Sequence, residues 1–318
     1  MRGYVFSELT PVDRLVAPAT LELLAVRRLQ LYAAITPRER ARAGEIVAAC
    51  RAAGVTVGLW PMLADADGRW ASAWNGVAFA AYVRDLLDEL DARALRPDEV
   101  LVDLEPPIAL TRRLLRGRPA AFGPPPRIGA RALRGLIAEL SHAGVPVAAT
   151  VHPWAVCGPG RRGWQRAMGT PVEGVPFRRV FAMAYTSLIE GYSRGLCQRC
   201  DAEALLARWS AELDARLGDS AGIALGAIGI GALGDERCYR APGELARDAA
   251  IARGAGARHL ALFDLTGALD RPPAARWLDA FVEPAATESV AGPRVRVRAT
   301  LQVIGGAGLL LDRLLRAR

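Results

Sequence analysis

The sequence contains no lysine: all 41 of its basic Lys and Arg residues are arginine, and Asn75 is its only asparagine. The joint scarcity of these two residues in a chain rich in alanine, glycine and proline favours GC-biased codon usage. Because the arginines are also scattered along the chain, we do not interpret the net charge of +8 as a sign of a nucleic-acid partner. Without lysine, Schiff-base catalysis and a phosphate-binding P-loop lysine are excluded.

Long apolar runs are also scarce. The segment Ala299–Leu311 is interrupted by polar residues and glycines, and it is shorter than the roughly 20 residues that a membrane-spanning helix needs. The N-terminus lacks the apolar core of a secretory signal, so the sequence predicts a cytoplasmic protein without a transmembrane span. Five cysteines are few for 318 residues and fit a reducing compartment.

Short apolar runs alternate with helical patterns along most of the chain, which is typical of βα units in a parallel sheet. Eight runs have the composition of strands: Gly3–Ser7, Leu29–Ile35, Val55–Trp60, Val100–Glu105, Val145–Val151, Arg179–Tyr185, Ile223–Ile230 and His259–Leu265. Eight such units in a chain of this length predict an α/β protein with a closed (β/α)8 TIM barrel. We assign residues 1–284 to the barrel and residues 285–318 to a short C-terminal extension.

In the extension, Arg294, Arg296 and Arg298 alternate with valines as in an exposed strand, and Leu309–Leu315 fits a short amphipathic helix. Packing across the barrel floor is the simplest expectation for this extension, and contact with a membrane surface is the alternative. Two segments rich in proline, glycine and arginine, 106–126 and 153–176, follow strand ends. They are predicted to form the walls of a cleft, since the carboxyl ends of the strands form the active face of such a barrel.

The fourth run ends in two acids, Asp103 and Glu105. Residues two apart lie on the same side of a strand, so both carboxylates are predicted to point into the barrel mouth. Two carboxylates this close oppose each other's ionisation and can retain a proton near neutral pH, which a general acid requires. In the alternative interpretation, Asp103 pairs with an arginine and Glu105 caps the next helix.

Aromatic and polar side chains end the other strands. Seven tryptophans are present, and five of them fall in or beside the predicted upper loops: Trp60, Trp70, Trp74, Trp154 and Trp164. Aromatic faces beside carboxylates suit a sugar-binding cleft, because pyranose rings pack on aromatic rings while acids bind the hydroxyls. We therefore expect a carbohydrate substrate, bound by Trp60, His152, Trp154, Met183, Phe263 and Asp264.

These residues resemble the chitinase-like family 18 glycoside hydrolases, which end the fourth strand in D-x-x-D-x-D-x-E, the sixth in M-x-Y-D and the eighth in a tryptophan. Here Asp103-Leu104-Glu105 ends the fourth run, Met183-Ala184-Tyr185 the sixth, and Phe263 the eighth. The resemblance implies a retaining hydrolysis assisted by the substrate's own 2-acetamido group. It assigns Glu105 as the acid, Asp103 as the residue that orients the acetamide, and Tyr185 as its hydrogen-bond partner.

The sequence departs from the family pattern at three positions. Leu101 replaces the second Asp of the first motif, Thr186 replaces the Asp after the tyrosine, and Phe263 replaces the tryptophan, while Asp98 fits the first position. The departures favour a second hypothesis, a non-catalytic carbohydrate-binding or scaffold barrel. A third possibility uses Glu105 as acid with a nucleophile after the seventh strand, where Asp235 and Glu236 are available.

The cysteines raise the question of a metal site or disulfide. Cys197 and Cys200 form a CxxC after the sixth strand, and Cys157 and Cys238 follow the fifth and seventh. Adjacent loops at the upper face leave open a zinc site, a disulfide or ordinary thiols. A metal site of His152 with Asp103 and Asp264 ranks lower, because no two histidines have ligand spacing. No nucleotide-binding glycine loop follows a strand, and no cofactor is expected.

Overall fold

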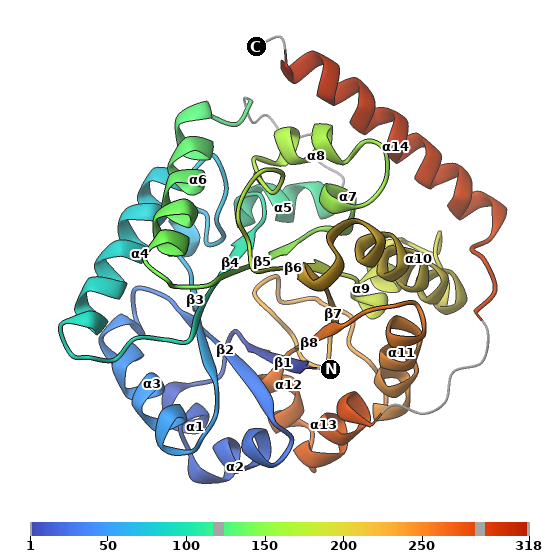
Figure 1. Cartoon of the computed structure of the whole chain (residues 1–318). Coiled ribbons are helices and arrows are strands. Elements are labelled where there is room, and N and C mark those ends of the chain that lie inside the picture. The colour runs from blue at the N-terminus through green and yellow to red at the C-terminus, as the bar shows by residue number, and fades with distance from the viewer. Residues whose placement is uncertain (1, 117–123, 284–289, 317–318) are drawn as a thin grey trace.

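Eight parallel strands close into a barrel in the computed structural model, which describes residues 2–116, 124–283 and 290–316 (Figure 1). The strands are β1 (Arg2–Ser7), β2 (Leu29–Ile35), β3 (Val57–Pro61), β4 (Glu99–Leu104), β5 (Val147–Val151), β6 (Arg179–Met183), β7 (Ala221–Gly226) and β8 (His259–Phe263). Each strand pairs with its neighbours in sequence, and β1 pairs with β8 to complete the ring. The predicted (β/α)8 TIM barrel is therefore confirmed.

The alternation of side chains along β4 separates the barrel interior from the layer beneath the helices. Val100, Val102 and Leu104 are completely buried in the outer core, whereas Leu101 belongs to the interior cluster. Large aromatic side chains fill that interior, with alanines on the neighbouring strands leaving room for them: Tyr4, Phe6, Tyr32, Phe181, Ala148, Ala224 and Ala261. This period of two places Asp103 on the inward side with Leu101.

Fourteen helices lie in the described part of the chain, most of them around the barrel (Figure 1). The first seven are α1 (Val12–Leu15), α2 (Pro18–Val26), α3 (Ala43–Ala52), α4 (Gly76–Asp91), α5 (Ile108–Leu115), α6 (Arg127–His142) and α7 (Pro153–Val156). The others are α8 (Arg161–Met168), α9 (Thr186–Tyr192), α10 (Arg199–Leu217), α11 (Pro242–Gly254), α12 (Leu265–Asp270), α13 (Ala274–Val282) and α14 (Val295–Arg316). The two proline-rich segments contain α5, α7 and α8; residues 117–123 of the first lie outside the described residues.

The C-terminal helix α14 packs against α8, on the outside of the ring between α6 and α10 (Figure 1). Glycines let the two backbones approach closely: a Cβ at Gly163 would stand 1.8 Å from the carbonyl oxygen of Gly308. A Cβ at Gly160 would likewise stand 2.5 Å from the carbonyl oxygen of Gly305. Because α7 and α8 have only four and eight residues, α14 supplies the outer cover that a full-length fifth helix normally gives.

The structure corrects two expectations for the extension. It is one helix of 22 residues, so the predicted exposed strand around Arg296 is wrong, and the helix lies against α8 instead of across the barrel floor. The glycines at 305, 306 and 308 made a long helix improbable from sequence, but Gly308 is required by the close contact with Gly160. Among the described residues, no helix has the length and apolarity needed to cross a membrane.

We expect opposite effects from two alanine substitutions in α14. A Cβ at Gly308 would stand 2.4 Å from the main-chain oxygen of Gly160, whereas one at Gly306 meets nothing within 4 Å. Gly306→Ala should therefore raise the free energy of unfolding by about 0.5–1 kcal/mol, through the better helix propensity of alanine. Gly308→Ala should lower it by about 1–3 kcal/mol through overpacking. Urea unfolding measures both changes; equal stabilities would contradict this account of the α8–α14 contact.

Candidate active site in the barrel mouth

A cavity of about 230 Å³ lies at the carboxyl ends of the strands. Its volume is below the roughly 300–1,000 Å³ of common ligand pockets, which suits a small ligand such as a single sugar ring. Four carboxylates and a wall of aromatic rings line it: Glu8, Asp103, Glu105, Glu236, Phe6, Trp60, Trp70, Trp154, Tyr185 and Phe263. His152 and Met183 also line it, so eight of the nine predicted site residues surround this cavity.

Asp103 is 3% exposed at the end of β4, and the hydroxyl of Thr150 on β5 donates a 2.6 Å hydrogen bond to its Oδ1. Burial raises the pKa of Asp103 well above its usual range, and the nearby charge of Glu105 raises it further. Asp103 therefore favours its protonated form. The alternative pairing of Asp103 with an arginine is not formed among the described residues.

Glu105 follows β4 and is 8% exposed. The Nε2 atom of His152, the residue after β5, lies 3.0 Å from its Oε2, and the imidazole ring stacks on Trp154 with a centroid separation of 5.2 Å. The proline at 153 begins α7 directly after His152 and fixes the main chain there. The sequence placed His152 in the site but did not predict that it would contact Glu105 and orient its carboxylate.

Two aromatic pairs form the walls. Tyr185, after β6, stacks on Phe263 at the end of β8, with ring centroids 5.4 Å apart. Trp60 on β3 packs at 5.5 Å against Phe6 on β1, and its indole nitrogen is buried without a hydrogen-bond partner among the described residues. Burial raises the pKa of Tyr185 well above its usual value, and the neighbouring acids of the barrel mouth raise it further, so its hydroxyl remains a hydrogen-bond donor.

Glu8 directly follows β1 and lines the cavity, and the sequence analysis did not single it out. Arg69 donates two hydrogen bonds to its Oε1, at 2.9 and 3.0 Å from Nη2 and Nε, and the amide of Ala232 donates one of 3.2 Å to its Oε2. Burial nevertheless raises the pKa of Glu8 from 4.5 to about 7, against the lowering effect of Arg69. The criterion that singled out Glu105, an acid at a strand end, applies equally to Glu8.

The two candidate nucleophiles after β7 have different surroundings. Glu236 lines the cavity, and its two oxygens accept hydrogen bonds of 2.9 Å from the amides of Leu233 and Gly234. Asp235 is exposed and accepts a 2.7 Å hydrogen bond from the hydroxyl of Tyr192. Of the two, only Glu236 is in position to face a ligand in the mouth.

Asp264 is the predicted site residue that does not line the cavity. It is completely buried as the N-cap of α12, where its Oδ1 accepts a 3.0 Å hydrogen bond from the amide of Gly267. Two of the five loop tryptophans also lie elsewhere, because Trp164 donates to the carbonyl of Ile304 in α14 and Trp74 packs at Gly169. Proximity to a strand end in sequence did not reveal which way these side chains turn.

The cysteines do not combine into a site. Cys157, Cys197, Cys200 and Cys238 are free thiols. Within the described ranges, no group of three or more His, Cys, Asp or Glu side chains is arranged to hold a metal ion, which also applies to His152 with Asp103 and Asp264. The zinc site and the disulfide that the sequence left open are therefore not formed among the described residues.

No protein-family model and no curated protein matches the sequence. Solved structures do match the fold. The glycoside hydrolase domain of PgaB (BpsB) from Bordetella bronchiseptica has a TM-score of 0.54 at 15% identity, covering 89% of this chain and 99% of that chain. The class V chitinase from Nicotiana tobaccum has 0.50 at 11%, covering 88% and 98%.

A third match has a different chemistry. The D-allulose 3-epimerase from Methylomonas sp. has a TM-score of 0.51 at 12% identity, covering 89% of this chain and 96% of that chain. At these identities the matches establish the barrel fold, and the activity has to be argued from the residues in the mouth.

We expect Glu8 to make folding stability depend on pH. Its pKa is about 7 in the folded protein and 4.5 ordinarily, so the folded state binds the extra proton. The resulting stabilisation is fully present below pH 4.5 and is lost as the pH rises to 7. The unfolding free energy of the wild type relative to Glu8→Gln should fall by up to about 3 kcal/mol over that range, at roughly 1.4 kcal/mol per pKa unit.

Urea unfolding of both proteins at several pH values between 4 and 8 measures this difference. Glu22→Gln, which removes an exposed carboxylate from α2, controls for the change in net charge. A difference between wild type and Glu8→Gln that stays constant or grows with pH would show that Arg69 keeps Glu8 ionised.

Proposed function

We propose that the protein is a glycoside hydrolase that binds a sugar ring in the barrel mouth and protonates the glycosidic oxygen with Glu105. The observation that carries this proposal is the Asp103–Glu105 pair, buried at the end of β4 and surrounded by aromatic walls. The similar fold of two glycoside hydrolases supports it. Stacking on Trp60, Trp154 or the Tyr185–Phe263 pair would hold the ring, while the carboxylates bind its hydroxyls.

The proposed reaction uses the proton that Asp103 retains. An acetamide N–H that donates to Asp103 favours the carboxylate form, so the proton moves to Glu105. Glu105 then transfers it to the glycosidic oxygen as the bond to the anomeric carbon breaks, and the acetamide carbonyl oxygen forms a bond to that carbon. Water attacks the resulting cyclic intermediate, and Glu105 accepts the proton that the water releases.

The proposed substrate is therefore an N-acetylated or related sugar, in line with the resemblance to family 18. The hydroxyl of Tyr185 forms no hydrogen bond with any described residue. Burial and the nearby acids Asp103, Glu105 and Glu8 raise its pKa, so it stays protonated and can donate to an acetamide oxygen. Leu101, which stands where family 18 has its second Asp, lies in the apolar interior two residues before Asp103. The hydrogen bond to Asp103 comes instead from Thr150 on the neighbouring strand.

A second candidate, a carbohydrate-binding barrel without hydrolase activity, is favoured by Thr186. This residue stands where family 18 has an aspartate, but its side chain turns away from the mouth and contacts Asp248 and Arg199 in a buried network under α10 and α11. The mouth then lacks the carboxylate of the M-x-Y-D motif. The two candidates predict the same ligand and differ in whether Glu105 transfers a proton.

We expect the wild type to hydrolyse at least one member of a panel of fluorogenic glycosides that includes N-acetylglucosaminides and chito-oligosaccharides. Glu105→Gln keeps the size of the side chain and removes the acid, so kcat should fall by about 10²–10⁴-fold. Melting temperatures establish that both proteins are folded. Binding of chito-oligosaccharides by both, without turnover by either, would refute the hydrolase and support the binding barrel.

Four further variants separate the possible nucleophiles. If the acetamide is the nucleophile, Asp103→Asn and Tyr185→Phe should lower kcat on N-acetylglucosaminides, and Glu236→Gln should retain most of it. If Glu236 is the nucleophile, as in other retaining enzymes, a Glu236→Gly variant should be inactive and should regain turnover with azide, giving a glycosyl azide product. Product analysis by mass spectrometry distinguishes the two mechanisms.

A further inference from the structure

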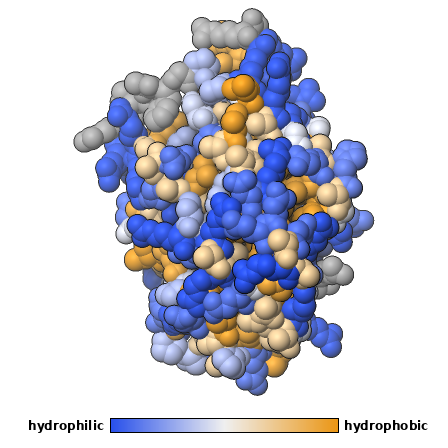
Figure 2. All heavy atoms as spheres, turned by 90° about the vertical axis from the view of Figure 1, so that its left-hand side faces the viewer, coloured by the Kyte–Doolittle hydropathy of each residue, from blue (hydrophilic) through white to orange (hydrophobic). Residues whose placement is uncertain are grey.

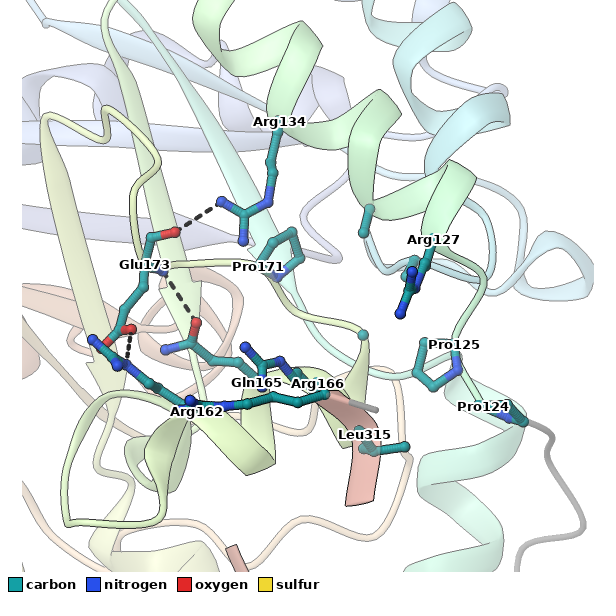
Figure 3. Close-up of a pocket in the computed structure, with 14 residues that line it drawn as sticks. Pro124, Pro125, Arg127, Arg134, Arg162, Gln165, Arg166, Pro171, Glu173 and Leu315 are labelled. Atoms are coloured by element: carbon teal, nitrogen blue, oxygen red, sulfur yellow. Dashed lines mark hydrogen bonds and ion pairs between the residues drawn. The ribbon is translucent and has the colours of Figure 1, made fainter. Parts of the chain in front are cut away.

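A cavity lined by arginines lies outside the barrel mouth, between α6, α8 and the C-terminal end of α14 (Figure 3). Its volume is about 750 Å³, and its rim carries five arginines and one acid: Arg127, Arg134, Arg162, Arg166, Arg316 and Glu173. In Figure 3, Arg134 and Arg127 extend from α6 on one side, and Arg162 and Arg166 from α8 on the other. None of these residues belongs to the proposed active site.

The acids near this cavity are already engaged. The carboxylate of Glu173 pairs with Arg161 and Arg162, and that of Asp312 pairs with Arg166 and Arg316. Arg127 forms no ion pair within the described ranges, and the one hydrogen bond of Arg134 goes to the main-chain carbonyl of Glu173, at 2.8 Å. The cavity therefore has an excess of guanidinium groups that can bind an anion.

An apolar stripe runs along the exposed side of α14 and reaches this cavity. We define the stripe as Val295, Ala299, Val303, Leu310 and Leu314. Successive members are four or seven residues apart, about one or two helical turns, so they lie on one side of the helix. Val303 is 71% exposed and Leu314 is 58% exposed. A solvent-facing side of a helix is normally polar; on the side of the barrel formed by α3, α4 and α6, for example, Figure 2 shows apolar atoms scattered among hydrophilic ones.

The charges on α14 complement an anionic surface. Arg296 and Arg313 border the stripe, and the one acid of the helix, Asp312, is buried and neutralised by Arg166 and Arg316. An amphipathic helix with an apolar side and arginines along its edges is the pattern that lies in a membrane interface. Because no described helix spans a bilayer, such contact would be peripheral.

We propose that the arginine cavity and the α14 stripe form one docking surface for an anionic phospholipid bilayer. The cavity binds the phosphate of a headgroup through Arg127 and Arg134, and the stripe inserts at the boundary between headgroups and acyl chains. Guanidinium groups suit phosphate because they donate paired hydrogen bonds to its oxygens. Leu315 lines the cavity and the neighbouring Leu314 belongs to the stripe, so the cavity and the stripe both reach the last turn of α14. A free phosphate ester would leave the stripe without a partner.

Co-flotation of the full chain with vesicles tests this surface. The wild type should bind vesicles of phosphatidylcholine with 30% phosphatidylglycerol and should not bind phosphatidylcholine alone. The pair Val303→Glu and Leu310→Glu should reduce binding at least tenfold. The pair Arg127→Gln and Arg134→Gln should reduce it by a similar factor, since each arginine near an anionic surface contributes about fivefold.

The controls make equivalent changes elsewhere. Val26→Glu alters a valine of α2 that is 72% exposed, and the pair Arg38→Gln and Arg276→Gln removes two exposed arginines outside the cavity. Both should bind like the wild type, and all proteins should melt at similar temperatures. No binding of the wild type to the anionic vesicles, or unchanged binding by either test pair, would overturn the proposal. A third outcome would also overturn it: glycerol 3-phosphate raises the melting temperature of the wild type but not of the Arg127→Gln and Arg134→Gln pair, and the wild type does not bind vesicles. The cavity would then bind a soluble phosphate.

Discussion

The pairing of β1 with β8 is the constraint on which the rest of the structure depends. It joins the ends of a sheet whose strands are all parallel, so no edge remains and alternate side chains of every strand converge on one axis. The convergence brings Glu8 from the first strand, Asp103 and Glu105 from the fourth and Phe263 from the eighth to one cavity. Without closure, these residues, distant in sequence, would lie on separate parts of a sheet.

Inside the closed barrel, two acids of β4 have different environments. Glu99, at the lower end, forms an ion pair with Arg179 and accepts hydrogen bonds from Tyr32 and Gln30. Asp103 lies two residues after Leu101 on the same side of the strand. It accepts a hydrogen bond from the hydroxyl of Thr150, and no arginine of the described ranges forms an ion pair with it. Burial without an ion pair favours the protonated form of Asp103, whereas the ion pair with Arg179 compensates the charge of Glu99 at the lower end of the strand. The barrel thus separates a structural acid from a proton-holding one along a single strand.

The hydrophobic patterns of the sequence were sufficient for the barrel, because each strand is a short apolar run bounded by turn residues. β2 was predicted at its full length, whereas β7 begins two residues earlier and ends four residues earlier than expected. The Asp103–Glu105 pair followed from the period of two. Glu8 follows the first strand as Glu105 follows the fourth, so the same rule applied to the end of β1 would have found it. Contacts such as His152 with Glu105, or the cap made by Asp264, depend on backbone directions after the strands, which local sequence does not specify.

The helix α14 shows a second limit of sequence analysis. Glycines destabilise an isolated helix, yet Gly308 is what allows α14 to lie against Gly160 and Gly163, so tertiary packing determines the local structure. Alternating arginine and valine at its start fits a strand equally well until Arg294 is anchored by its ion pair with the buried Asp201. Long-range contacts thus decided between two local conformations that the sequence alone allowed.

The charges of the molecule are segregated in a way that relates the two proposed surfaces. Four carboxylates face the mouth, accompanied by Arg69 and His152, while the arginine cavity opens at the outside of the ring. An acidic mouth disfavours polyanions and an arginine cavity attracts them, so the two surfaces select different ligands. Because α14 lies beside the ring in a view along the barrel axis (Figure 1), a bilayer on α14 would leave the mouth open at its side. Membrane docking would then restrict where the protein acts without obstructing the entry of a soluble sugar.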